Sequence, residues 1–61
     1  MRKLIFEIKE DSKIRHMEFI TDRTPGWTVQ QYLRNRPGII MTLISNESID
    51  KQEPSSREII N

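Results

Sequence analysis

TVQQYLRNRPG, residues 28–38, is the one stretch of this chain whose apolar residues recur with a clear helical period. Val29, Tyr32 and Leu33 follow the i, i+3, i+4 spacing that gathers side chains on a single helical face. Pro37 disfavours helical geometry at the residue before it, so we expect the helix to end near residue 35. Such a short helix is stable only if its apolar face packs against another element.

The start of this helix has two candidates. Thr28 is a favourable N-cap, and Gln31 three residues later completes a capping-box pattern. Thr24, followed by Pro25 at the first helical position, is the alternative start and would add a turn. We expect Trp27 to supply further apolar cover over the surface on which the helix packs.

Residues 3–21 predict that surface, because apolar and polar side chains alternate there with the period of a β-strand. A polar turn centred on residues 11–12 makes a hairpin in which Phe6 faces Met17. The apolar side chains of both strands then lie on the same side, whereas a slip of one residue would separate them.

Residues 39–45 alternate again and predict a third strand, which returns most simply beside the first. The predicted fold class is α+β: a small ββαβ domain with a three-stranded, mainly antiparallel sheet in the order 2-1-3, one short helix on one face and a flexible C-terminal tail. A parallel placement beside the second strand, with a right-handed crossover, is the alternative. We assign residues 1–46 to the domain and 47–61 to a polar, disordered tail. The helix side of the sheet would carry Leu4, Phe6, Ile8, Met17, Phe19, Ile39, Met41 and Leu43.

The length of 61 residues allows one domain, which buries too little surface to be comfortably stable alone. The chain has no cysteine and one histidine, which excludes disulfides and thiolate metal sites and makes a zinc site improbable. Oligomerisation is the remaining way to stabilise so small a domain. We therefore expect a homodimer.

Ten basic and nine acidic residues give a net charge of +1, with no strong attraction to nucleic acid or anionic membranes. No apolar run approaches the length needed to span a bilayer. We expect a cytoplasmic protein with no membrane partner. Ten isoleucines and no alanine suggest AT-rich codons, hence a low-GC bacterium or its phage; a phage protein would act in the host cytoplasm.

The second face of the predicted sheet is unusually apolar for a surface in water. A patch of this kind often marks a protein interface. The alternatives are that the tail folds back over it, or that scattered exposed isoleucines are ordinary. The contact between two copies would use this face or the edge of the third strand, which has no proline, lysine or arginine to block pairing. The predicted interface residues are Ile5, Ile14, Ile20, Ile40 and Ile44.

No catalytic, cofactor-binding or metal-binding motif is recognisable, and no small-molecule substrate is indicated. Glu7 and His16 face each other in the hairpin register, which suits a general base, part of a metal site or a surface ion pair. We interpret them as a cross-strand ion pair. The protein is expected not to be an enzyme and to need no cofactor.

Two functional hypotheses follow. The first is a small non-enzymatic regulator or inhibitor that binds another protein through the apolar sheet face. The alternative is a nucleic-acid-binding regulator that uses Arg23, Arg34 and Arg36 around the helix. In that case Trp27 and Tyr32 would stack on bases.

Overall fold

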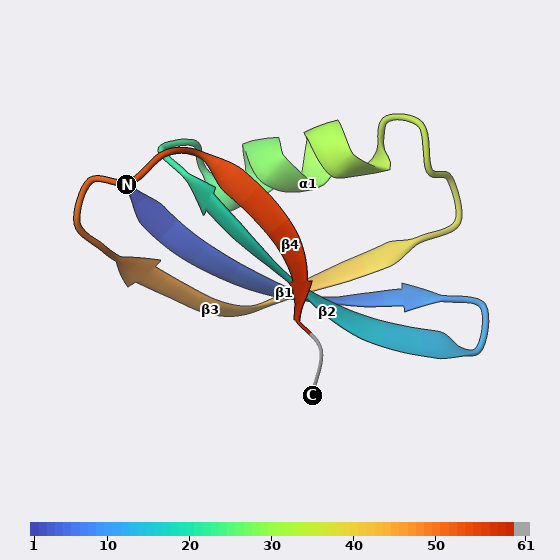
Figure 1. The fold of residues 1–61 in the computed structure, drawn as a ribbon. Coiled ribbons are helices and arrows are strands. Elements are labelled where there is room, and N and C mark those ends of the chain that lie inside the picture. The colour runs from blue at the N-terminus through green and yellow to red at the C-terminus, as the bar shows by residue number, and fades with distance from the viewer. Residues whose placement is uncertain (60–61) are drawn as a thin grey trace.

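One helix lies over a four-stranded antiparallel sheet (Figure 1). The structure, a computed structural model, describes residues 1–59, so Ile60 and Asn61 of the expected tail lie outside the described residues. The sheet order is β3-β1-β2-β4. The elements are β1 (Arg2–Glu10), β2 (Lys13–Thr21), α1 (Pro25–Leu33), β3 (Ile40–Ser48) and β4 (Ser55–Ile59).

The hairpin register is confirmed. Phe6 lies opposite Met17 and Leu4 opposite Phe19, and the turn passes through Asp11 with a positive φ of 56°. Asp tolerates this left-handed conformation better than most residues, which helps to close a short turn. The paired apolar side chains meet on the helix side, where the rings of Phe6 and Phe19 pack edge to face with centroids 5.7 Å apart.

β3 pairs antiparallel with β1, which confirms the central position of β1 among the first three strands. The register shifts between Ile5 and Phe6, because Ile5 pairs with Ser45 whereas Phe6 pairs with Leu43. Ile44 is therefore the extra residue of a β-bulge, a feature that bends the strand and increases its twist.

The prediction of three strands followed by a flexible tail is wrong for residues 55–59, which form β4 along the free edge of β2. Ser55 lies opposite Ile20 and Ile59 opposite His16. The physical reason is that the second edge of β2 would otherwise leave a row of backbone groups unpaired, and even a polar segment satisfies them. β3 also continues to Ser48, two residues beyond the expected end of the domain.

The helix begins at the alternative start, so the proposed cap at Thr28 is wrong. Thr24 is the N-cap, and its Oγ1 accepts a hydrogen bond from the backbone N–H of Trp27 at 3.1 Å. Pro25 occupies the first helical position, where its missing N–H costs nothing. Thr28 is buried inside the first turn, and its hydroxyl donates to the carbonyl of Thr24.

The core lies between α1 and the sheet, and most of the predicted helix-side residues are there. The buried members come from β1 and from the residue before β3, and α1 packs on them through Val29, Tyr32 and Leu33. Leu43 is an exception: it shares the helix face with Phe6 by register, but it lies on the edge strand and stays 41% exposed. The buried cluster is Leu4, Phe6, Ile8 and Ile39.

Trp27 does not cover the sheet, contrary to the prediction, and is 44% exposed. The earlier helix start explains why. Once the helix includes Trp27, its i+3, i+4 and i+7 neighbours are Gln30, Gln31 and Arg34, all of which are exposed. Trp27 therefore belongs to the solvent face, where the guanidinium of Arg23 lies 5.1 Å from its ring centroid.

Candidate protein-binding surface

The face of the sheet opposite α1, called here the outer face, is organised in cross-strand rows. Strand pairing and the alternation of side chains define these rows, because residues directly opposite each other point to the same side. Following the order β3, β1, β2 and β4, the rows are Ile40, Lys9 and Ile14; then Thr42, Glu7, His16 and Ile59; then Ser45, Ile5, Glu18 and Arg57; and finally Glu47, Lys3, Ile20 and Ser55.

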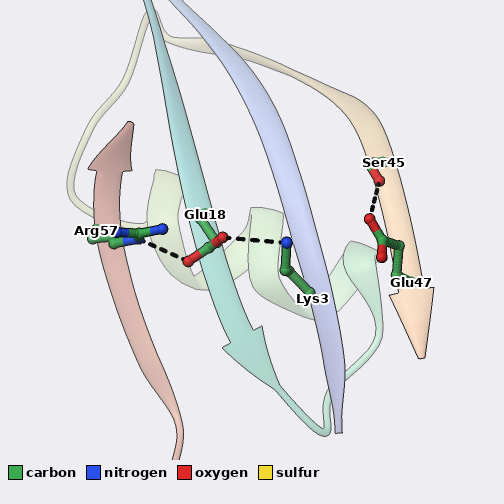
Figure 2. A network of polar contacts seen from close by, with 5 residues as sticks. All are labelled: Lys3, Glu18, Ser45, Glu47 and Arg57. Atoms are coloured by element: carbon green, nitrogen blue, oxygen red, sulfur yellow. Dashed lines mark hydrogen bonds and ion pairs between the residues drawn. The ribbon is translucent and has the colours of Figure 1, made fainter. Parts of the chain in front are cut away.

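Charged residues occupy the middle of this face, as Figure 2 shows from the side opposite the helix. The Glu18 side chain is only 12% exposed and lies between two cations. Arg57 donates to its Oε2 at 2.8 Å, and Lys3 Nζ lies 3.8 Å from its Oε1. The hydrogen bond and the attraction to Glu18 raise the pKa of Arg57, so this guanidinium stays charged at every physiological pH. No local sequence pattern indicates this row, since Arg57 reaches Glu18 only through the pairing of β4 with β2.

Glu7 and His16 face each other as predicted, with Oε2 of the carboxylate 3.9 Å from Nε2 of the imidazole. The contact is an ion pair whenever the histidine is protonated. Across residues 1–59 no set of three histidine, cysteine, aspartate or glutamate side chains is placed to hold a metal ion. No pocket is found within the same range.

The predicted isoleucine interface does not form one continuous patch. Ile20 is only 6% exposed and Ile5 is half-buried, so neither offers much surface to a partner. Ile14 and Ile40 are exposed, at 55% and 62%, but Lys9 stands between them on β1. Ile44, 53% exposed, lies on β3 at the bulge. Strand pairing places Ile5, Ile14, Ile20 and Ile40 on the outer face, as expected, and charged rows divide this face; their role at an interface stays a prediction.

Exposed apolar side chains are instead concentrated along β3, at one edge of the sheet. Ile40, Leu43 and Ile44 are all more than 40% exposed, and we call these three residues the β3 margin. From residue 37 to residue 46 the chain carries no charge. An edge strand presents unpaired backbone N–H and C=O groups, and proteins usually protect it with lysine, proline or a covering segment.

The opposite edge of the sheet shows such protection. β4 has only five residues, follows Pro54 and contains Arg57 and Glu58. A short, charged strand after a proline is a poor template for further pairing. The β3 margin is therefore the more open of the two edges, both in backbone and in side chains.

The predicted nucleic-acid contacts lie at the two ends of α1, with Arg23 before its start and Arg34 and Arg36 after its last residue. Arg23 lies before α1, stacks on Trp27 and pairs with Asp22 at 3.8 Å. Arg36 lies beyond the other end of the helix, where its guanidinium is 4.4 Å from the ring centroid of Tyr32 and donates to that residue's carbonyl. Arg34 caps the C-terminus of α1 and is exposed.

No helix among the described residues is long and apolar enough to cross a membrane. Comparisons with protein-family models, curated proteins and solved structures find no match to this chain.

Proposed function

We propose that this protein is a small non-enzymatic regulator or inhibitor that binds other protein chains through the β3 margin. The observation that carries the proposal is the coincidence of three exposed apolar side chains with an edge strand that is uncharged from residue 40 to residue 46 and not covered by another described segment. Either feature alone is common on small proteins. Together they supply both components of strand addition, in which backbone hydrogen bonds give affinity and side-chain contacts give specificity.

Burial of exposed apolar surface would supply the free energy for this contact. Fully burying an isoleucine is worth roughly 1.5–3 kcal/mol, and Ile40 still exposes 62% of its surface. A partner that covers the three side chains of the β3 margin would gain a few kcal/mol from apolar area alone. That amount is useful for recognition, although association must also offset lost rigid-body freedom.

A comparison of two isoleucine variants tests this proposal. Ile40→Lys places a charge on the β3 margin, whereas Ile14→Lys makes the same change at a similarly exposed isoleucine of the same face but on β2. We expect the first variant to lose the proteins that the immobilised wild type retains from native lysate, and the second to keep them. Equal retention by both variants, with both still folded, would contradict the role of the β3 margin.

The second candidate function, nucleic-acid binding, is favoured by one observation on the helix side. Between residues 24 and 46 the chain has no acidic residue, while Trp27, Gln30 and Arg34 share the solvent face of α1. An aromatic ring beside arginines is a typical stacking platform for single strands. Retention on heparin or DNA that falls steeply with salt, and is reduced by Arg34→Gln, would support this candidate over protein binding. No retention, or retention that does not change with salt concentration, would exclude nucleic-acid binding.

A further inference from the structure

We propose that the first partner of the β3 margin is a second copy of the same chain. In this arrangement β3 pairs antiparallel with β3 of the other copy, and Thr42 lies on the twofold axis. The two four-stranded sheets then become one continuous sheet. This inference rests on the proposed function, because both use the edge of the sheet at β3. It adds which molecule binds there and how the two β3 strands are aligned.

The register follows from the side chains of β3. A twofold axis at Thr42 sets Ile40 opposite Ile44 of the other copy, and Met41 opposite Leu43. Directly opposed residues in antiparallel strands bring their Cβ atoms to about 4.5–5.5 Å, so each exposed apolar side chain gains an apolar neighbour. An axis one residue later, at Leu43, would instead place Ile40 against Asn46 and Met41 against Ser45. The arrangement centred on Thr42 matches the exposed side chains better.

The same register determines how the helices are disposed. Opposed residues share a side of the joined sheet, and both Ile40 and Ile44 belong to the outer face by alternation along β3. The two outer faces therefore continue into each other, and both copies of α1 lie on the opposite side. Leu43, left 41% exposed at the rim of the core, would be covered there by Met41 of the other copy.

The distribution of charged side chains allows a twofold contact at β3 but disfavours one at β4. A twofold contact sets each residue near its own equivalent, so charges close to the axis repel. β3 has no charged residue near Thr42, and the antiparallel arrangement directs the end carrying Glu47 toward the end carrying Arg36 of the other copy. The same operation on β4, about its middle residue, would oppose Arg57 to Arg57.

The regular part of β3 is long enough for the contact. Residues 40–43 pair with β1 without interruption, and the bulge begins only at Ile44. The bulge lies at the middle residue of β3, so the regular stretch is the first half of the strand, and the proposed pairing ends at Ile44. This limit is a further reason to place the axis at Thr42 rather than later in the strand.

Cysteine substitution tests both the partner and the register, because the chain contains no cysteine of its own. Under mild oxidation Thr42→Cys should form a disulfide-linked dimer. Ser55→Cys, exposed on the opposite edge strand, is the matched control and should form no disulfide-linked dimer, because its two copies lie far from the proposed axis. A mixture of Ile40→Cys and Ile44→Cys proteins should give mainly the mixed dimer, since each of these residues faces the other and not itself.

Sedimentation of the unmodified protein provides a second measurement. We expect the wild type to sediment at micromolar concentrations with twice the mass of a single chain, and Ile14→Lys to behave likewise. Thr42→Lys, which places two lysines across the axis, should sediment as a folded monomer. Circular dichroism of each variant checks that loss of the dimer is not loss of the fold.

The outcomes separate this inference from the proposed function. The second copy would be ruled out as the partner if the wild type is a monomer, or if Thr42→Cys cross-links no faster than Ser55→Cys. In either case, loss of target binding in Ile40→Lys would still support the proposed function. Self-linked dimers of Ile40→Cys in place of the mixed dimer would overturn the register. If Thr42→Cys forms the cross-linked dimer but Ile40→Lys loses none of the proteins that the wild type retains from lysate, the dimer would be supported and target binding refuted.

Discussion

Replacing Ile8 with valine measures how tightly the helix and sheet are packed. Ile8 is fully buried near the end of β1, so the lost methyl group leaves a small cavity in the core. Such a change typically costs 0.5–1.5 kcal/mol, and a domain of this length has only roughly 3–9 kcal/mol of total stability. Ile40→Val makes the same chemical change at a position 62% exposed, where we expect an effect below about 0.5 kcal/mol. Both residues lie in strands, so strand propensity cancels in the comparison.

Thermal unfolding followed by circular dichroism, in dilute solution where self-association is minimal, distinguishes the two substitutions. For a domain this small, about 1 kcal/mol corresponds to a fall of roughly 8 °C in melting temperature. We therefore expect a clear decrease for Ile8→Val and a shift of at most a few degrees for Ile40→Val. Equal shifts for the two variants would refute the assignment of Ile8 to the core, and with it the packing of α1 on that face of the sheet.

Three further predictions concern the backbone, the helix start and the last strand. Gly38→Ala should lower the free energy of unfolding by about 1 kcal/mol, because residue 38 has a φ of +87°, which alanine adopts only with strain. Gly26→Ala should raise the free energy of unfolding by about 0.5 kcal/mol, because the added Cβ meets open space in the first turn of α1. Shifts of the same sign in the melting temperatures of the two variants would contradict this prediction. Thr24→Ala should cost about 1 kcal/mol by removing the helix N-cap, and Thr24→Ser should restore most of it; urea titrations giving equal losses would mean that the hydroxyl does not cap. Truncation after Ser48 should lower the melting temperature but preserve a cooperative transition, since no residue of β4 belongs to the buried cluster; a broad, non-cooperative melt would show that β4 is part of the core.

Local chemistry was sufficient to predict the hairpin and its register. The period of two along β1 and β2 excludes a slip of one residue, which would separate Phe6 from Met17, and the polar turn at Asp11 selects the observed alignment among those that remain. The helix was located equally well, because Val29, Tyr32 and Leu33 have no other arrangement that buries them together. Its first turn was harder, since two threonines satisfied the capping rules, and the hydrogen bond from the Trp27 N–H to Thr24 Oγ1 in the folded structure decides between them.

The candidate surface was predicted in part. The excess of isoleucines on the outer face is visible in the sequence, and so is the lack of protection along β3. Burial of Ile20 and division of the face by Lys9 depend on which residues lie across from each other on three strands. These cross-strand neighbours are distant in the chain, so no local pattern reveals them.

By itself, the sequence determined the alternation of the strands, the apolar face of the helix and the alignment of the hairpin, because each depends on residues near one another in the chain. Only the tertiary structure decided that residues 55–59 form a fourth strand. That segment has a single large apolar residue and little strand signal of its own. It pairs because the edge of β2 offers unpaired backbone groups and because Glu18 offers a carboxylate to Arg57, conditions that exist only once the hairpin has folded.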